Sequence, residues 1–330
     1  MIPIRDIVPS RTYPLVNNLL IGTNVVLFFF QLSLGSEAEQ LIYQWALIPA
    51  RYTVDGIASH FSLSAQISAL FSYMFLHGGF LHLLSNVWFL YIFGDNVEDH
   101  LGHGRYLFFY LFCGCASGVV HILFNWHSTI PVIGASGAVA GVMGAYFLLH
   151  PNARILTLIP IIIIPVFVHI PAFVFLGIWF VFQFLSAAGG HGQAAGVAFW
   201  AHLGGFAAGM AMLPFLRALP QARIEGRLQK ATAKNSSPRF QVVRPEGLPE
   251  SPDLFATLVL TPAEAARGAQ KTINAAWGFH NRIFKVNIPP GSKDGTLVRL
   301  HGAGRRIDET NSGDLYIRIA VRSPARAGMW

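Results

Sequence analysis

The chain has 330 residues, of which 53% are hydrophobic and only 12% are charged, and its formal net charge is +7. Its mean hydropathy is +0.48. Soluble globular domains carry about 25% charged residues, so this composition excludes an ordinary soluble protein. The Lys and Arg residues gather in a few loops and in the tail. We therefore interpret the positive charge as a signal of membrane topology and expect no nucleic-acid partner.

Six apolar segments are predicted to cross a bilayer, which takes ~20 residues for each helix. They run from about Val16 to Leu34, from Gly79 to about Phe93, from Tyr106 to Phe124, from Ser136 to His150, from Ala172 to Ala188, and from Val197 to Leu216. The first of these lacks a cleavage pattern and is predicted to be a retained helix. Residues 35–68 are expected to lie partly in the membrane interface.

The stretch from Ile155 to His169 is apolar but is interrupted by prolines, so it predicts an interfacial or re-entrant piece, with a seventh span left open. The basic residues outside the spans test this count. One side carries Arg5, Arg11, Arg105, Arg154, Arg217, Arg223, Arg227 and Lys230, and the other carries only Arg51. The positive-inside rule therefore places both termini in the cytoplasm.

Three of the predicted spans begin on the outer side, and each has a polar residue near its start. Ser136 opens one span, His202 lies near the start of another, and His82 and Asn86 lie four residues apart on one face of a third. A serine at a helix start is more often a simple cap. Ionisable groups at membrane depth, however, are costly and usually functional.

A serine becomes a nucleophile when a base takes its proton, and His202 is the candidate base. The ring of His82, the amide of Asn86 and the backbone N–H of Ser136 are candidate donors to an oxyanion. No acidic residue lies near these positions within the spans, so the sequence predicts a Ser–His pair without a carboxylate. Glycines spaced by four residues along both the Ser136 and the His202 helices predict close packing of these helices.

Together these motifs resemble the rhomboid family of intramembrane serine proteases. The resemblance covers residues 1 to about 217 and is carried by the segment from Gly134 to Gly137, by His82 with Asn86, and by the segment from Ala201 to Gly205. Gly94, Glu98 and Gly102 also match the family pattern. The resemblance implies Ser136 as nucleophile, His202 as general base, His82 and Asn86 as oxyanion-stabilising residues, and His77, Gly134 and Gly137 in supporting positions. It also implies single-pass transmembrane proteins as substrates, with no cofactor and no metal.

Two departures from the family pattern are visible. Ala140 stands where some members have an aromatic residue that stacks on the base histidine, so His202 is expected to be held differently. The tryptophan–arginine pair of some members is missing from its usual place, although Trp45 and Arg51 lie earlier. His77 and His82 also permit a metal-pair interpretation, but no third ligand lies near them in the sequence.

The remainder of the chain changes character twice. Residues 218–252 are rich in Arg, Lys, Ser and Pro and predict a basic flexible linker, which either contacts anionic lipid headgroups or is a solvated tether. Residues 253–330 contain β-prone runs separated by glycine and proline turns, which predict a small β-sandwich. This segment resembles the C-terminal substrate-binding domain of DnaJ-type co-chaperones. The matching segments are Pro262 to Gly268, Ile288 to Gly291, Asp294 to Gly295, Arg299 to Gly304 and Gly313 to Tyr316.

The predicted fold is thus an all-α, polytopic, six-helix membrane bundle (1–217), followed by a linker (218–252) and an all-β cytoplasmic domain (253–330). The predicted function is intramembrane serine endopeptidase activity, and the predicted location is the bacterial inner membrane. The tail is expected to bind an unfolded peptide or a chaperone partner. The alternative is a non-catalytic membrane adaptor that binds transmembrane helices. A transporter would need midplane charges and internal repeats, and neither is seen.

Overall fold

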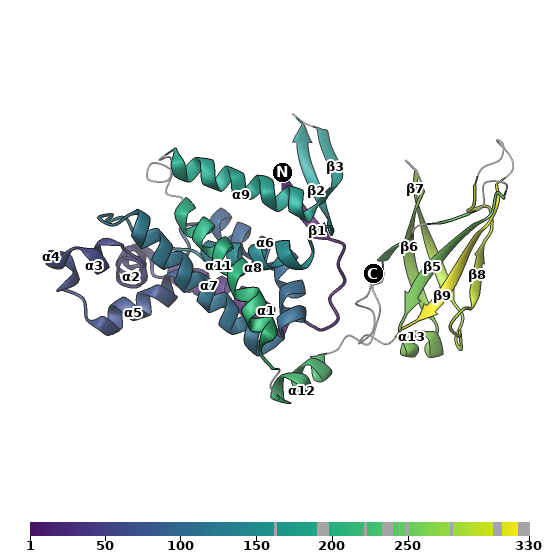
Figure 1. Cartoon of the computed structure of the whole chain (residues 1–330), viewed down its shortest axis with the longest axis horizontal. Helices are drawn as coiled ribbons and strands as arrows, with labels where there is room; N and C mark the ends of the chain where they lie inside the picture. Colours follow the sequence, from purple (N-terminus) through teal and green to yellow (C-terminus); the bar gives the residue numbers. More distant parts are fainter. Residues whose placement is uncertain are drawn as a thin grey trace. The chain divides into compact units, whose positions relative to one another are not determined.

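The computed structural model describes residues 1–161, 164–189, 198–220, 223–232, 240–243, 245–247, 251–277, 280–305 and 312–322. The chain divides into two compact units, Met1–Thr232 and Ala233–Trp330 (Figure 1). Each unit has a hydrophobic core of its own.

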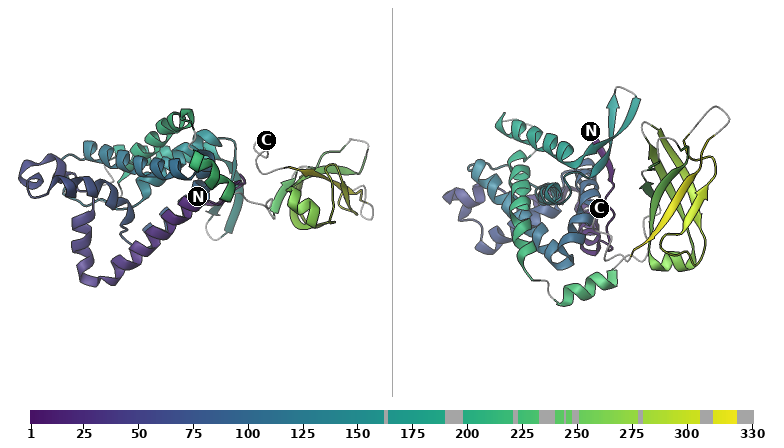
Figure 2. Two further views of the ribbon diagram at one scale, coloured as in Figure 1. Left: turned by 90° about the horizontal axis from the view of Figure 1, so that it is seen from below. Right: turned by 45° about the vertical axis from the view of Figure 1, so that its right-hand side comes forward.

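The first unit is mainly helical, and its elements include both long apolar helices and several short helices between the first two long ones (Figures 1 and 2). The long helices are α1 (Leu15–Ser33), α6 (Phe80–Leu101), α7 (His103–Phe124), α8 (Ser136–Leu149), α9 (Ala172–Ala188) and α11 (Phe199–Ala218). The short helices are η1 (Gly35–Glu37), α2 (Ala38–Trp45), α3 (Ala50–Thr53), α4 (Asp55–Ala58), α5 (Leu63–Ser72), η2 (Tyr73–Phe75) and α12 (Arg223–Thr232).

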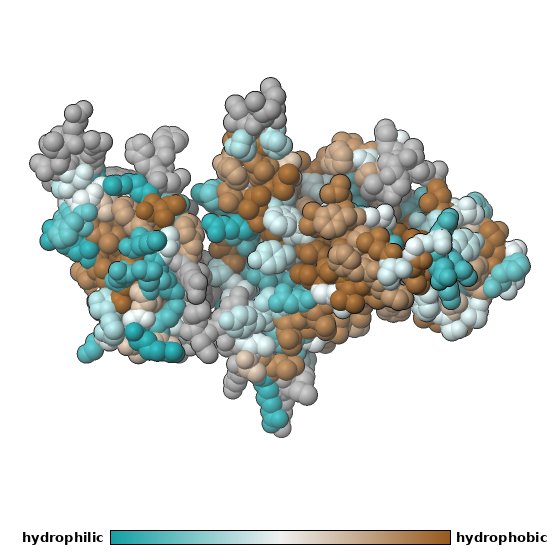
Figure 3. Space-filling model, turned by 180° about the vertical axis from the view of Figure 1, so that it is seen from behind, coloured by the Kyte–Doolittle hydropathy of each residue, from teal (hydrophilic) through white to brown (hydrophobic). Residues whose placement is uncertain are grey.

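Helix α8 lies at the centre of this unit. It packs against α6, α7, α9 and α11, and its residues from Gly137 to Tyr146 are all buried. The ring of Tyr146 packs edge-on against Phe93 of α6 with centroids 4.9 Å apart. Away from the core, many large apolar side chains of α1, α6, α7 and α9 are exposed, as expected for surfaces that face lipid (Figure 3).

Helices α8 and α11 approach so closely that their glycines cannot be replaced. A Cβ atom on Gly205 would lie 2.0 Å from the carbonyl oxygen of Gly137, and a Cβ atom on Gly209 would lie 2.0 Å from that of Gly141. These obstacles are backbone atoms, which no side-chain movement can clear. The predicted close packing of glycine-lined helices is therefore present.

The lengths of the helices leave the predicted number of spans open. By length and composition α1, α7 and α11 can cross a membrane, and a fourth span results if Leu63–Phe75 and α6, bent by 83°, count as one. Helices α8, with 14 residues, and α9, with 17, are shorter. Helix α6 also extends past the predicted end at Phe93 to Leu101, because Asn96 and Glu98 in its last turns are buried and hydrogen-bonded.

The all-α prediction for the first unit is wrong between α8 and α9. Strands β2 (Arg154–Ile161) and β3 (Ile164–Pro171) form an antiparallel pair there, and β1 (Ile2–Asp6) adds to the other edge of β2. The segment is thus not a seventh spanning helix. The prolines that prevent a helix lie where a hairpin tolerates them, since Pro160 is opposite Pro165 near the end of the ladder.

The predicted flexible linker also begins with ordered structure. Helix α12 lies against the start of α7, where the ring Nε2 of His103 is 2.8 Å from the hydroxyl of Thr232. The backbone N–H of Tyr13 donates to the carbonyl of Thr232 at 2.8 Å, and Arg105 donates to the carbonyl of Leu219 at 2.9 Å. Residues up to Thr232 therefore belong to the helical unit, although they were predicted to form a tether.

The second unit contains two three-stranded sheets that share one core. Its elements are β4 (Phe240–Val243), β5 (Leu254–Leu260), α13 (Pro262–Arg267), β6 (Ala269–Trp277), β7 (His280–Ile288), β8 (Leu297–Leu300) and β9 (Leu315–Val321). The sheet orders are β4-β6-β7 and β5-β9-β8, each with one parallel and one antiparallel pairing. Helix α13 begins with a capping box in which Thr261 and Glu264 satisfy each other's backbone N–H groups.

Candidate active site

The structure brings Ser136 and His202 into hydrogen-bond contact although 66 positions separate them in the chain. Ser136 is the first residue of α8, and His202 lies in the first turn of α11. The hydroxyl oxygen of Ser136 is 2.8 Å from the ring Nε2 of His202. This is the separation that a nucleophile and its base need for proton transfer.

The contact between α8 and α11 sets this separation, and α7 supports it. The hydroxyl of Ser117, on α7, donates to the carbonyl of Ala201 at 2.8 Å. A Cβ atom on Gly137 would lie 1.9 Å from that same hydroxyl oxygen. Gly137 therefore leaves the room that Ser117 needs to hold the backbone beside His202.

The other ring nitrogen of His202 has a partner that sequence reasoning missed. Its Nδ1 lies 2.6 Å from the side-chain Oε1 of Gln183, which is buried in α9. Trp179, one turn earlier in α9, places its ring 6.1 Å from the imidazole. His202 was expected to be held differently because residue 140 is an alanine, and its ring contacts Gln183 and lies near Trp179, both on α9. Gln183 is an isolated polar residue in an apolar helix and belongs to no sequence motif, so the sequence alone did not identify it.

His82 and Asn86 lie in the first two turns of α6, and both side chains reach toward Gly134. The backbone N–H of Gly78 donates to Nδ1 of His82 at 3.4 Å, so the ring hydrogen is on Nε2. A Cβ atom on Gly134 would lie 2.6 Å from that Nε2 and 3.7 Å from Nδ2 of Asn86. Within the described part of the chain, the buried Nδ2 of Asn86 has no hydrogen-bond partner.

Gly134 provides the space in which these donors meet. Its φ of +121° is one that residues with a side chain rarely adopt, and its N–H donates to the carbonyl of Tyr73 at 2.9 Å. Two residues later α8 begins, and the first N–H groups of a helix have no partner within the helix. The N–H of Ser136 is therefore a third donor next to its own hydroxyl.

His77 does not reach the serine, but it lies beside His82. Its ring is fully buried and packs edge-on against His82 with centroids 5.3 Å apart. The side-chain amide of Gln31, on α1, donates to the carbonyl of His77 at 2.7 Å and accepts from its N–H at 3.2 Å. These bonds fix the turn from which α6 and His82 start.

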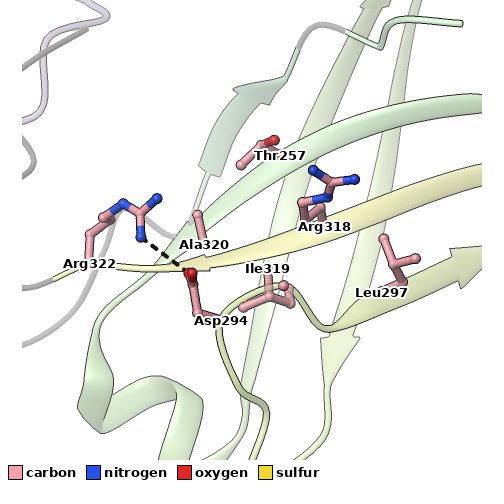
Figure 4. A pocket seen from close by; sticks show the side chains of 8 residues that line it. Thr257, Asp294, Leu297, Arg318, Ile319, Ala320 and Arg322 are labelled. Atoms are coloured by element: carbon pink, nitrogen blue, oxygen red, sulfur yellow. Dashed lines mark hydrogen bonds and ion pairs between the residues drawn. The ribbon is translucent and has the colours of Figure 1, made fainter.

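Two other possible sites offer less chemistry. No group of three or more His, Cys, Asp or Glu residues that could hold a metal ion is found in the described ranges. A shallow pocket in the second unit is lined by Thr257, Asp294, Leu297, Arg318 and Arg322, among others (Figure 4). Asp294 and Arg322 form an ion pair there at 3.2 Å, and the lining contains no nucleophile next to a base.

Comparison with protein families separates the two units. The model of the rhomboid domain matches residues 64–219, and that of the DnaJ C terminal domain matches residues 254–326. The chain carries a rhomboid domain and a DnaJ C-terminal domain. The rhomboid match includes every residue of the candidate site except Gln31, the partner of His77. The long apolar helices of this unit, together with the match, make the chain an integral membrane protein.

Individual relatives match shorter stretches of the chain. RHOMBOID-like protein 6, mitochondrial, and RHOMBOID-like protein 5, both of Arabidopsis thaliana, are 38% and 37% identical over 76 residues. These matches cover 23% of this chain and 24% and 25% of the relatives. DnAJ-like protein slr0093 of Synechocystis is 40% identical over 69 residues, which are 21% of this chain and 20% of that protein. The chain thus matches a fifth to a quarter of the length of these relatives.

Proposed function

We propose that the rhomboid domain is a serine endopeptidase that cleaves transmembrane proteins within the membrane. The observation that carries this proposal is the 2.8 Å contact between the Ser136 hydroxyl and His202, beside an unpartnered Asn86 amide donor. A nucleophile, a base and an oxyanion donor are the minimum for acyl transfer. No metal or cofactor enters the mechanism.

In the first half-reaction His202 Nε2 takes the hydroxyl proton while Ser136 Oγ attacks the carbonyl carbon of the scissile peptide bond. The carbonyl electron pair moves onto its oxygen and gives a tetrahedral oxyanion. His202 then returns the proton to the leaving nitrogen, the C–N bond breaks, and an acyl-enzyme remains. In the second half-reaction His202 takes a proton from a water molecule, which attacks the carbonyl carbon of the acyl-enzyme. His202 returns this proton to Ser136 Oγ, the ester bond breaks, and the free acid is released.

The oxyanion would be stabilised by Nε2–H of His82, Nδ2–H of Asn86 and the backbone N–H of Ser136. His82 Nε2 and Asn86 Nδ2 both lie close to Gly134, two residues before Ser136, and among the described residues the buried Asn86 donor has no acceptor. A buried donor that is left unpaired costs roughly 1–3 kcal/mol. This cost in the resting protein would be recovered when the oxyanion forms, which favours the transition state over the ground state.

The position of the site favours substrates that are themselves in the membrane. Helix α8 has 14 residues and is thus only about 21 Å long, less than the ~30 Å hydrocarbon core. Ser136 would therefore lie below the membrane surface, where it meets single-pass helices and bound lipid. The starts of α6, α8 and α11 carry the site, whereas Arg11 and Arg217 lie at the opposite end of the unit. We propose a bacterial inner membrane, with both termini cytoplasmic.

Cleavage of a single-pass model substrate in liposomes tests the proposal. Ser136→Ala and His202→Ala should each abolish cleavage with the fold retained. Ser33→Ala and His127→Ala, which change the same residue types at exposed positions, should cleave like the wild type. Equal cleavage by all variants would assign the activity to a contaminant. A wild type that binds transmembrane helices but cleaves none would support the adaptor alternative.

For the second unit we propose a peptide-binding role, either for unfolded clients or for the tail of a chaperone partner. The supporting observation is an exposed face of the β5-β9-β8 sheet on which Phe255 stacks on Tyr316 at 5.2 Å, with Arg299 beside Tyr316. Aromatic and arginine side chains are typical of peptide-binding surfaces. Phe255→Ala in the full chain should weaken binding of a fluorescent unfolded polypeptide, whereas Val242→Ala on β4, also exposed, should not.

A further inference from the structure

The side chain of Gln183 makes a contact that the Ser–His mechanism does not require. It is 6% exposed, and its one hydrogen bond within the described part of the chain goes to Nδ1 of His202 at 2.6 Å. Gln31, the buried glutamine of α1, bonds to the backbone of His77. Gln183 instead bonds to the ring of the proposed base.

The direction of this bond decides whether His202 can act. A neutral imidazole has one N–H and one bare nitrogen, and only bare Nε2 can take the Ser136 proton. The ring hydrogen must then be on Nδ1, where the carbonyl oxygen of Gln183 accepts it. With the hydrogen on Nε2, the ring would donate to Ser136 and catalysis would stop.

We propose that Gln183 is the positioning residue of the site, which holds His202 in the Nδ1–H tautomer and orients its ring toward Ser136. The proposal rests on the function proposed above for Ser136 and His202. It places on α9 the task that a carboxylate performs in other serine hydrolases. Because Gln183 is neutral, it fixes the tautomer without adding a buried charge to the membrane interior, where a charge is costly.

Trp179 supports the same conclusion from the same face of α9. Its position, four residues before Gln183, puts both side chains on one side of the helix. The Trp179 ring lies beside the imidazole, with centroids 6.1 Å apart and planes 30° apart, and the Gln183 oxygen accepts the ring hydrogen. The orientation of the base is therefore set by α9, whereas its distance from Ser136 is set by α8 and α11.

Three variants of the full chain in detergent or liposomes test the proposal. Gln183→Met keeps the length and flexibility of the side chain but has no oxygen to accept the ring hydrogen. Gln183→Glu keeps an acceptor at the same place and should restore most of the activity. Phe182→Leu, at the next position on α9 and exposed, is the matched control. Thermal unfolding identifies any variant that has lost its fold.

Two kinetic readouts are measured: the rate at which a fluorophosphonate modifies Ser136, and kcat and KM for the model substrate. Gln183→Met should lower the modification rate and kcat by ~10–100-fold, by analogy with the loss when a partner that orients a metal-binding histidine is removed, with KM unchanged. Gln183→Glu should stay within a few-fold of wild type, and Phe182→Leu should match it. An unchanged modification rate in Gln183→Met, or an effect on KM alone, would overturn the proposal.

Nitrogen NMR of ¹⁵N-histidine-labelled protein separates this proposal from the proposed function, because it needs no turnover. Wild type should show His202 with a protonated Nδ1 and a bare Nε2, and Gln183→Met should show a mixture of tautomers. If the fluorophosphonate does not modify the wild type at all, the proposed protease function fails, and the NMR result still decides on Gln183. A His202 spectrum that is the same in wild type and Gln183→Met would reject its positioning role.

Discussion

The carboxylate of Glu225 caps a helix that begins 122 positions earlier, since its Oε1 accepts from the backbone N–H of His103 at 2.5 Å. Its Oε2 accepts from the next N–H, that of Gly104, at 3.0 Å. Glu225 thus satisfies two of the free N–H groups at the start of α7, where a negative charge also complements the helix dipole.

We therefore expect Glu225→Gln to lower the free energy of unfolding by roughly 1–2 kcal/mol, because charge-assisted hydrogen bonds at a buried helix start become neutral ones. Thermal unfolding in detergent measures this loss. Trypsin should also cut faster after Arg227, since α12 would be held less firmly. Glu39→Gln, at an exposed position of α2, is the control. A Glu225→Gln protein as stable and as resistant to trypsin as the control would show that the cap contributes nothing.

The unpartnered amide of Asn86 predicts a change in activity without a loss of stability. Asn86→Ala should lower kcat by ~10²–10³-fold, the effect of removing one oxyanion donor. The melting temperature should stay the same or rise, because the buried Nδ2 makes no hydrogen bond to any residue that the structure describes. A large fall in melting temperature would mean that Asn86 acts chiefly as a structural residue.

Gly134→Ala should inactivate the protein through backbone strain and a collision. The added methyl group would lie 2.6 Å from Nε2 of His82, at a φ of +121° that alanine rarely adopts. We expect a loss of roughly 1–3 kcal/mol in stability together with the loss of cleavage. Gly22→Ala, in α1, has open space around its Cβ and should be neutral or stabilising. Wild-type activity in Gly134→Ala would refute the proposed oxyanion site.

Asp6 predicts a pH dependence of stability that is independent of the candidate active site. Burial raises the pKa of its carboxyl to about 7, with the nearby Asp95 charge adding to the effect, while the hydrogen bond from Tyr146 at 2.6 Å opposes it. The unfolded chain loses this proton near the ordinary value of 3.8, whereas the folded chain holds it to about 7. The free energy of unfolding should therefore fall as the pH rises from about 4 to 7, and level off above 7.

The variant Asp6→Asn isolates this contribution, because its amide carries no charge at any pH. The stability of Asp6→Asn minus that of wild type should be larger at pH 8 than at pH 5, as measured by thermal unfolding at both pH values. Asp55→Asn, at an exposed position of α4, should show no such change. If the Asp6→Asn difference were constant across this range, the carboxyl would not be titrating there.

Much of the helical unit could be predicted because apolar length and helix breakers are local signals. The segment from Ala172 to Ala188 was predicted with the bounds it has, since Pro171 precedes it and glycines follow. The sequence predicted that four polar residues lie at a similar depth, because each is near the start of its helix. These residues are Ser136, His202, His82 and Asn86. Their roles remain predictions until the variants are measured.

The features that were missed depend on partners far away in the chain. The run from Arg154 to Pro171 becomes a hairpin whose edge is completed by β1, about 150 positions earlier in sequence, and no local pattern reports that pairing. Gln183 acquires its importance only because α9 folds back onto α11. The helical order of α12 likewise depends on the free N–H groups of α7, which Glu225 reaches.

The glycine contact between α8 and α11 has a consequence for how this protein can change over evolution. Gly205 and Gly209 meet backbone oxygens of the facing helix, so the spacing of Ser136 and His202 is set mainly by contact between two backbones, with the Ser117 hydroxyl of α7 supporting it. Residues on the exposed apolar faces of α6 and α9 can therefore be exchanged while Ser136 and His202 keep their spacing. The proposed chemistry would then be inherited with the backbone contact, whereas the surface of the helical unit would be free to diversify.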